Sequence, residues 1–251
     1  MRYNVFNNLL VDMTLTNWFK RLTMELKMKL LKTTVVAGLL AASGAASALE
    51  LSGNIALTTD YVWRGVSLSD NAPAIQGGFD ADLGNGLYAG VWGSNVDAAD
   101  DSNGLELDLY GGWAGEFSGV GVDIGIIHYH FNGSSNNGLN TDEIYIGLSM
   151  GPVSLTQYFG IDAGSEDIGD VNFGDYTDLG LDLGEYNGVA FAAHVGYYNF
   201  HHTSIDAWDV KLAASTSMFG VDWELAYTDT DDAELGKNDD DKVILTVSKS
   251  L

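Results

Sequence analysis

The sequence predicts an all-β fold, an antiparallel transmembrane β-barrel of about 12 strands with short periplasmic turns and long external loops. Three observations predict it. Apolar and polar residues alternate along many successive segments, the connections between these segments alternate between long and short, and tryptophans lie near segment ends on the apolar face. No segment after residue 48 approaches ~18 consecutive apolar residues, so a membrane-spanning helix is excluded there.

The first 48 residues are expected to lie outside the fold. The stretch 28–48 begins with two lysines, continues with a short apolar run and ends in Ala-Ser-Ala, which is typical of a secretory signal peptide. Residues 1–27 precede a complete signal, which indicates a mis-annotated upstream extension. The mature chain is therefore expected to be a single domain over residues 49–251.

The mature chain is strongly acidic. Removing residues 1–48 takes away six of the 11 basic residues and two of the 35 acidic ones. The remaining 5 basic and 33 acidic residues give a formal net charge of −28. Such a surface repels nucleic acid, so we expect no nucleic-acid partner. The chain has no cysteine, which excludes disulfides and thiol chemistry.

Each expected strand is bounded by turn residues, and none carries a helical period. The first, 51–63, alternates from Leu51 to Trp63 without a break and would cross the hydrocarbon with its odd residues facing lipid. The eleven that follow are 74–83, 87–95, 105–117, 121–131, 143–150, 153–161, 176–183, 189–200, 205–215, 221–228 and 243–251.

The connections decide between a barrel and a sandwich. They are long after the first, third, fifth, seventh and eleventh strands, modest after the ninth, and short after every even strand. An outer-membrane barrel with both ends in the periplasm produces this pattern. A soluble β-sandwich has less reason to gather its long loops at one end, although it stays open as an alternative.

Aromatic residues predict where the barrel meets the lipid headgroups. Indole and phenol rings favour that level of the bilayer, and most of the tryptophans share the apolar face of their strands, with Trp92 on the other face. The expected aromatic girdle consists of Tyr61, Trp63, Trp113, Trp208 and Trp223.

If the apolar face meets lipid, the opposite face lines the lumen. A lumen rich in carboxylates favours cations through its electrostatic potential, although the same residues can be no more than a solvated wall. Twelve strands leave a narrow interior. The expected pore-lining residues are Asp60, Arg64, Asp80, Asp82, Glu106, Asp108, Glu143, Asp178, Asp182, Lys211, Asp222 and Glu224.

No metal site or cofactor is expected. His128 and His130 form an H-x-H pair, but the sequence identifies no third or fourth ligand, so they are weak candidates only. Their face also remains open, because they share parity with Val122, Ile124 and Ile126. Serines in the loop at 132–141 lack a fixed base, and the acidic loop at 229–241 lacks EF-hand spacing, so neither an enzyme nor a calcium loop is expected.

Residues 53–97 resemble the proteobacterial TorF-type porin family, also called the Gcw_chp domain. The matching positions are Leu57, Thr58, Asp60, Tyr61, Arg64, Gly65, Pro73, Ala74, Gln76, Gly77, Gly78, Gly86, Tyr88, Gly90, Trp92, Ser94 and Asn95. The segments at 106–115 and 123–133 continue the match more loosely, whereas Trp63 and the final Leu251 depart from it. The resemblance implies an outer-membrane barrel and a pore, and it carries over no catalytic residue. Arg64 is then either a constriction charge paired with Asp60 or Asp80, or a rim ion pair.

The sequence therefore predicts an exported outer-membrane porin of a Gram-negative bacterium. It would pass small hydrophilic solutes with a bias towards cations and would contact outer-membrane lipid and lipopolysaccharide. Two alternatives remain, a non-conducting outer-membrane barrel with a structural, adhesive or binding role and a soluble periplasmic or secreted β-sandwich binding protein. The oligomeric state is left open.

Overall fold

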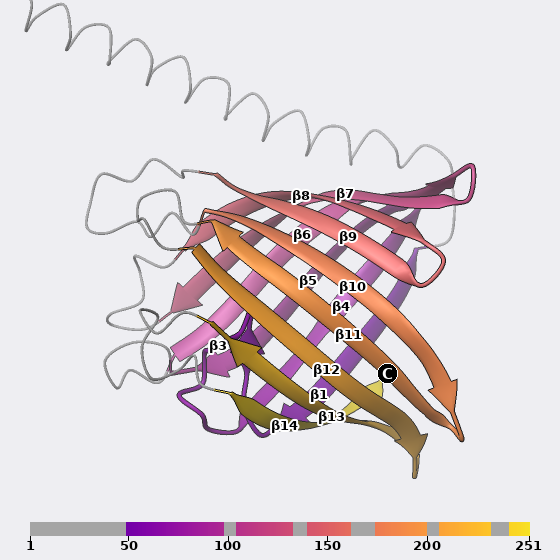
Figure 1. Cartoon of the computed structure of the whole chain (residues 1–251). Coiled ribbons are helices and arrows are strands. Elements are labelled where there is room, and N and C mark those ends of the chain that lie inside the picture. Colours follow the sequence, from indigo (N-terminus) through magenta and orange to yellow (C-terminus); the bar gives the residue numbers. More distant parts are fainter. Residues whose placement is uncertain (1–48, 98–103, 133–139, 162–173, 200–205, 232–240) are drawn as a thin grey trace, which may run out of the picture. The chain divides into compact units, whose positions relative to one another are not determined.

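In a computed structural model, the chain forms a closed antiparallel barrel of 12 strands, each hydrogen-bonded to two neighbours (Figure 1). The structure describes residues 49–97, 104–132, 140–161, 174–199, 206–231 and 241–251. The barrel strands are β1 (Glu50–Thr58), β4 (Ala74–Gly84), β5 (Leu87–Val96), β6 (Gly104–Phe117), β7 (Val120–Asn132), β8 (Thr141–Met150), β9 (Val153–Ile161), β10 (Asp175–Tyr186), β11 (Val189–Asn199), β12 (Asp206–Met218), β13 (Val221–Thr230) and β14 (Lys242–Ser250).

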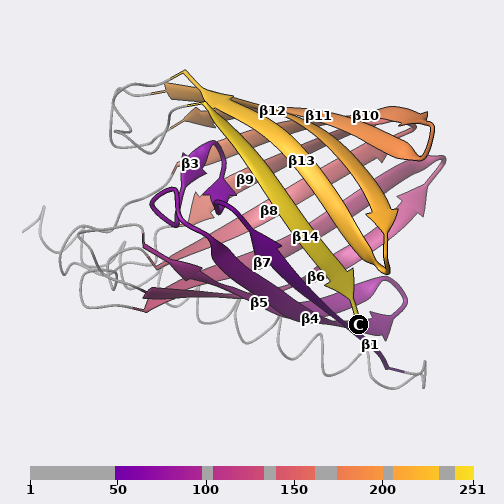
Figure 2. The same ribbon diagram turned by 90° about the horizontal axis from the view of Figure 1, so that it is seen from below.

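The ring closes where the first strand meets the last. β1 pairs on one side with β4 and on the other with β14, where Leu57 lies opposite Val247 (Figure 2). All other barrel neighbours are consecutive in the chain, as in an up-and-down barrel. The predicted barrel and its strand number are therefore confirmed, and the closed ring rules out the soluble β-sandwich.

Two faces of opposite character follow from the alternation of side chains. Large apolar residues are exposed on the outside, among them Leu51, Phe79, Leu212 and Val243, with exposed fractions of 53–71%. In water this arrangement would be unfavourable, but in lipid it is the stable one. The described residues contain no helix with the length and apolar character to span a bilayer.

Two-residue turns connect the strands at one end, as predicted. Asn85-Gly86, Ser118-Gly119, Asn187-Gly188 and Phe219-Gly220 each have positive φ at both positions, between 53° and 83°. This is the geometry of a type I′ turn, whose twist matches that of the flanking strands. Phe219 adopts it although it is bulky, and its side chain is 94% exposed.

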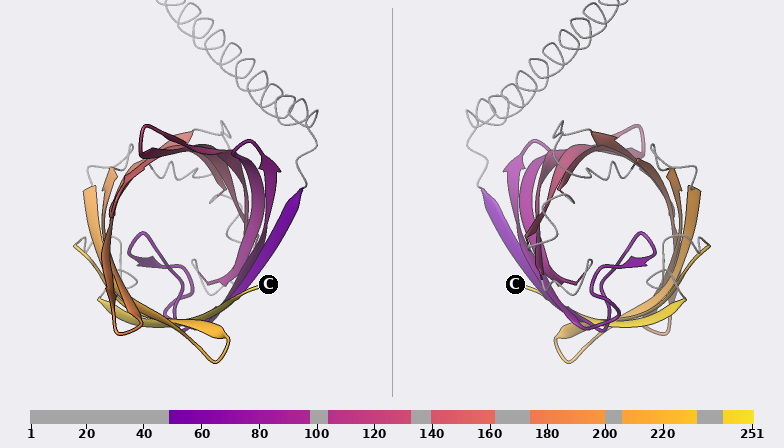
Figure 3. Two further views of the ribbon diagram at one scale, coloured as in Figure 1. Left: turned by 90° about the vertical axis from the view of Figure 1, so that its right-hand side faces the viewer. Right: turned by 90° about the vertical axis from the view of Figure 1, so that its left-hand side faces the viewer.

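The first strand ends earlier than predicted. Barrel pairing stops at Thr58, and residues 59–73 turn into the interior as a hairpin made of β2 (Val62–Trp63) and β3 (Val66–Ser67). Viewed along the barrel, this segment lies within the ring of strands (Figure 3). The alternation continues through Trp63 because the inner hairpin also buries aromatic residues, which made the two segments indistinguishable by pattern. We call residues 59–73 the inner hairpin.

Buried apolar residues gather around this hairpin. One cluster contains Tyr61 with Val96, Tyr129 and Phe131, and a second contains Tyr176, Tyr198 and Ala207. Trp63 packs against both clusters. The hydrophobic core of this barrel therefore lies inside its lumen, at the end of the strands from which the inner hairpin enters.

A charge on the outer face should destabilise the barrel more than the same charge on the inner face. Leu212→Arg places a guanidinium in lipid, so we expect the free energy of unfolding in phospholipid vesicles to fall by about 2–4 kcal/mol. Ser215→Arg, on the same strand but on the inner face, is the matched control and should cost less. Equal costs for the two variants, measured by denaturant titration, would contradict the assignment of the faces.

Candidate pore constriction

The inner hairpin is held in shape by one aspartate. Asp60 is buried, and its Oδ1 accepts hydrogen bonds from Ser67 Oγ at 2.6 Å and Ser69 Oγ at 2.9 Å. Ser69 Oγ in turn accepts from the backbone N–H of Tyr61, and the backbone N–H of Leu68 donates to the carbonyl of Tyr61 at 2.7 Å. The barrel pairing of β1 ends at Thr58, and the hydrogen bonds of Asp60 with Ser67 and Ser69 stabilise the hairpin beyond that point.

Arg64 and Gly65 form the tip. Both have positive φ, 49° and 82°, so the tip is a type I′ turn between Val62–Trp63 and Val66–Ser67. The tip contacts the barrel wall at β13, where the Gly65 carbonyl accepts a hydrogen bond from Thr230 Oγ1 at 3.0 Å. A Cβ on Gly65 would lie 2.0 Å from that oxygen and 2.7 Å from Asp209 Cβ, so only glycine fits.

Arg64 is bound to Glu143 of β8 by two parallel hydrogen bonds. Nη1 donates to Oε1 at 2.8 Å and Nη2 donates to Oε2 at 2.7 Å, while Nη1 also donates to the Tyr198 hydroxyl at 3.1 Å. The side chains are 6% and 0% exposed. Burial lowers the pKa of Arg64, but the hydrogen bonds and charge of Glu143 outweigh this effect and raise its pKa, so the guanidinium stays charged.

Four aromatic rings surround the same guanidinium. Arg64 Cζ lies 4.2 Å from the ring centroid of Trp63, 4.4 Å from that of Tyr176, 4.7 Å from that of Tyr158 and 5.4 Å from that of Tyr198. These distances are within the range of cation–π attraction, which strengthens when the site is desolvated. The rings and the bidentate carboxylate together offset the cost of burying the ion pair.

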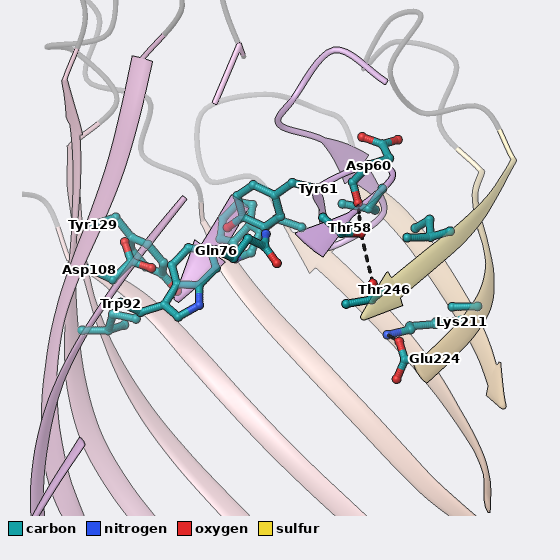
Figure 4. A pocket seen from close by; sticks show the side chains of 15 residues that line it. Thr58, Asp60, Tyr61, Gln76, Trp92, Asp108, Tyr129, Lys211, Glu224 and Thr246 are labelled. Carbon is teal, nitrogen blue, oxygen red and sulfur yellow. Dashed lines mark hydrogen bonds and ion pairs between the residues drawn. The ribbon is translucent and has the colours of Figure 1, made fainter. Parts of the chain in front are cut away.

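A cavity of about 420 Å³ remains beside the inner hairpin. Figure 4 shows Asp108, Trp92 and Tyr129 on one side and Lys211, Glu224 and Thr246 on the other. A second cavity, of about 460 Å³, lies by the turn after β4 and is lined by Asp80, Asp82 and Tyr88 among others. The inner hairpin therefore crosses the interior from the β1 side to Glu143 on β8 and Thr230 on β13, and the first cavity lies beside it.

The structure places all the predicted lining residues on the interior side of the wall or on the inner hairpin. Asp60 and Arg64 belong to the hairpin, and Arg64 pairs with Glu143 rather than with the expected Asp60 or Asp80. The other ten lie on the strand faces opposite the exposed apolar residues, and they are Asp80, Asp82, Glu106, Asp108, Glu143, Asp178, Asp182, Lys211, Asp222 and Glu224.

Most of these charges have a specific partner. Lys211 Nζ donates to Glu224 Oε1 at 2.7 Å, and the Tyr110 hydroxyl donates to Asp80. Asp82 and Asp182 each accept the backbone N–H of the glycine two residues on, at β-bulges in β4 and β10. Asp222 accepts a hydrogen bond from Ser217 Oγ.

Sequence reasoning did not assign several interior residues to the lumen. His194 lies between Asp178 Oδ2 (3.1 Å) and Asp209 Oδ1 (2.6 Å), and the Tyr176 hydroxyl donates to Asp209 Oδ2 at 3.0 Å. Strand parity could have found Asp209, because it shares a face with Lys211. The tyrosines around Arg64 were missed because aromatic rings were assigned to the lipid boundary.

Part of the predicted aromatic girdle is wrong. Tyr61 and Trp63 lie in the interior, where they pack against Trp92 and against Tyr129 and Tyr198. The other three lie on the outward parity near strand ends, and they are Trp113, Trp208 and Trp223. Whether these three rings form a girdle in a bilayer stays a prediction.

The two candidate metal histidines lie on the outward face of β7. His128 Nδ1 is 2.7 Å from Asp142 Oδ1, and the rings of His128 and His130 are stacked with centroids 6.3 Å apart. In the described ranges, no group of three or more His, Cys, Asp or Glu side chains could hold a metal ion. The serine-rich loop at 133–139 and most of the acidic loop after β13 lie outside the described residues.

Comparison with known proteins identifies the family. The sequence matches, over residues 42–250, the family described as "Bacterial protein of unknown function (Gcw_chp)". The chain belongs to this family. The predicted Gcw_chp membership is thereby confirmed, while the TorF-type assignment stays a prediction. No curated protein matches the chain.

Solved structures similar to this Gcw_chp protein include the KdgM porin and OprD. The KdgM porin aligns with a TM-score of 0.52 at 12% identity, covering 80% of this chain and 99% of that one. The KdgM porin in complex with disordered oligogalacturonate aligns with a TM-score of 0.49 at 12% identity, covering 81% of this chain and 99% of that one. OprD of Pseudomonas aeruginosa aligns with a TM-score of 0.38 at 14% identity, covering 81% of this chain and 66% of that one. At these identities the likeness to KdgM shows the barrel fold alone.

Removing Glu143 should release the inner hairpin. Glu143→Gln leaves the buried Arg64 charge unpaired, so we expect a loss of about 3–5 kcal/mol in the free energy of unfolding. Glu224→Gln is the matched control, because its pair with Lys211 is over one third exposed on both sides and should contribute about 0–1 kcal/mol. Denaturant titration measures both, and similar losses would refute a special role for the Arg64–Glu143 pair.

The tip should tolerate no side chain. Gly65→Ala is expected to move the tip off Thr230 and to expose Trp63, measured as increased acrylamide quenching in a background where Trp63 is the sole tryptophan. Gly188→Ala tests backbone strain alone, because Gly188 has φ +81° with open space around it. If both substitutions changed the quenching equally, steric contact at the tip would not be the cause.

Proposed function

We propose that this protein is an outer-membrane porin through which small hydrophilic solutes diffuse passively, with a bias towards cations. The observation that carries the proposal is the composition of the inner wall. Of the ten predicted lining residues on the barrel strands, nine are carboxylates and one is a lysine. A passage with this excess of negative charge attracts cations and repels anions.

The inner hairpin would set the size limit of such a passage. It reaches from β1 to Glu143 on β8 and to Thr230 on β13, and it is the part of the described chain that enters the interior. A solute would have to pass beside it, through spaces of the size of the 420 Å³ cavity. This favours single small solutes or hydrated ions over polymers. Oligogalacturonate, named with one of the similar barrels, is polyanionic, so we do not propose it as a solute here.

Export and location form part of the same proposal. Residues 28–48 would direct the chain out of the cytoplasm, residues 1–27 would be an upstream extension, and residues 49–251 would fold in the outer membrane of a Gram-negative bacterium. The exposed apolar belt would contact lipid, and acidic external loops would approach lipopolysaccharide through divalent ions. We propose no enzymatic activity.

A second candidate function is favoured by the same hairpin. An ion pair this well enclosed, with both side chains no more than 6% exposed, could hold the passage shut. The protein would then be a non-conducting barrel with a structural, adhesive or binding role. The two functions differ in one measurable property, the conductance of the folded barrel.

The deciding experiment is a recording from residues 49–251 refolded into a planar bilayer. We expect discrete conductance steps whose reversal potential under a salt gradient shows selectivity for cations. A barrel with heat-modifiable migration on a gel but without conductance would refute the open porin and support the non-conducting alternative. Conductance with anion selectivity would refute the cation bias alone.

Releasing the inner hairpin should widen the passage. Arg64→Ala removes the bond to Glu143, so we expect a larger single-channel conductance than in the wild type. Lys249→Ala, which removes an exposed positive charge on the outward face of β14, is the control and should leave the conductance unchanged. Unchanged conductance in Arg64→Ala would mean that the hairpin does not limit the flow.

A further inference from the structure

Two carboxylates on the inner face of β6 differ from the other buried acids. Glu106 is 0% exposed and Asp108 is 6% exposed. Both oxygens of Glu106 and Oδ1 of Asp108 are buried without a hydrogen-bond partner in the part of the chain that the structure describes. By contrast, the buried Glu143 is bound by Arg64 and the buried Asp60 by two serines.

When both groups are ionised, such a pair requires a positive counter-charge. Burying an ionised carboxylate without a partner costs several kcal/mol, and two neighbouring carboxylates also repel each other. Of the interior cationic side chains described above, Arg64 is paired with Glu143, Lys211 with Glu224, and His194 lies between Asp178 and Asp209. The described part of the chain therefore supplies no hydrogen-bonded cation to the oxygens of Glu106.

Tyr61 of the inner hairpin does not satisfy this pair either. Its phenol lies close enough to Glu106 to interact with the carboxylate, but it makes no hydrogen bond of good geometry to either oxygen. Burial, together with the charges of Glu106 and Asp108, raises the pKa of Tyr61 well above its usual value, so the phenol stays neutral. It lies near the pair without neutralising it.

A cavity with oxygen atoms in its wall lies beside Asp108. Asp108 lines the 420 Å³ cavity, whose wall also contains Thr58, Gln76 and Thr246 (Figure 4). A cavity of this size holds several water molecules. Carboxylate, hydroxyl, amide and water oxygens are the ligands that Ca²⁺ takes, six to eight at a time, whereas transition metals prefer nitrogen or sulfur.

We propose that Glu106 and Asp108 form a binding site for a divalent cation of the calcium class inside the barrel, beneath Tyr61 of the inner hairpin. The two carboxylates match the charge of the ion, and water in the cavity completes its coordination. With two protein carboxylates, the dissociation constant should be on the order of 10⁻⁴–10⁻³ M, as in weak extracellular calcium sites. The site goes beyond the porin proposal, because it requires no permeation.

The test uses Tb³⁺, a luminescent substitute for Ca²⁺, with the folded barrel in detergent. Trp92 lies opposite Asp108 in the β5–β6 register, so excitation of its indole should sensitise emission from a bound ion. We expect saturable emission that excess Ca²⁺ displaces and that Trp92→Phe removes. Emission that Ca²⁺ does not displace, or that persists at full strength in Trp92→Phe, would overturn the site.

Two substitutions locate the ion. Glu106→Gln and Asp108→Asn should each weaken Ca²⁺ binding at least tenfold, with folding verified by heat-modifiable migration. Glu116→Gln is the matched control, because it removes a carboxylate from the same face of the same strand at an exposed position, and its affinity should equal that of the wild type. Unchanged affinity in Glu106→Gln would disprove the assignment.

Thermal unfolding gives a second, independent measurement. Millimolar Ca²⁺ should raise the melting temperature of the wild type but not that of Glu106→Gln. In chelator, Glu106→Gln should be at least as stable as the wild type, since it removes a buried charge. A lower melting temperature of Glu106→Gln in chelator would show that Glu106 has a partner within the protein and would contradict the proposal. Neither readout depends on conductance, so this site and the porin function can fail separately.

Discussion

The constraint on which the whole structure depends is that lipid offers no hydrogen-bond partner to the backbone. Twelve strands meet this constraint only as a closed ring, which the pairing of β1 with β14 completes. Closure then determines the rest. Because side chains alternate along each strand, one face must be apolar towards lipid, and the polar residues of an acidic chain are collected in one narrow interior. The local features of that interior are solutions to the crowding of negative charge.

The charged pairs of the interior differ in how far water takes part in their stabilisation. The Lys211–Glu224 pair is over one third exposed on both sides, so water shares in its stabilisation. Arg64 and Glu143 are almost fully excluded from water, so their geometry has to replace hydration, and it does so with two parallel hydrogen bonds and four aromatic rings. Glu106 and Asp108 are buried without any such arrangement. Among the described interior residues, these three pairs thus differ in their access to water, and Glu106 with Asp108 is the pair for which we propose an external ion.

Sequence reasoning predicted the elements set by local rules. The ring of 12 strands, the short turns and the interior parity of Asp80, Glu106 and Lys211 follow from alternation and turn chemistry, which a single sequence displays. The inner hairpin was missed because Tyr61 and Trp63 continue the alternation of Leu51–Leu57, and alternation does not distinguish burial against lipid from burial against protein. The Arg64-Gly65 turn and the serines at 67 and 69 were the available signals. The bond between Arg64 and Glu143 could not be predicted, since it joins residues 79 positions apart through the geometry of the closed barrel.

The contacts of the inner hairpin span long stretches of the chain, and this orders the events of assembly. Arg64 bonds to Tyr198, 134 residues later, and Gly65 to Thr230, 165 residues later. Neither contact can form before β11 and β13 have taken their places in the wall, and the entropy lost in closing such long loops is repaid only at that stage. The hairpin near the start of the mature chain thus docks among the last elements, although it is synthesised among the first. A barrel that lacks its final strands retains this segment undocked, with its indole and guanidinium groups still exposed.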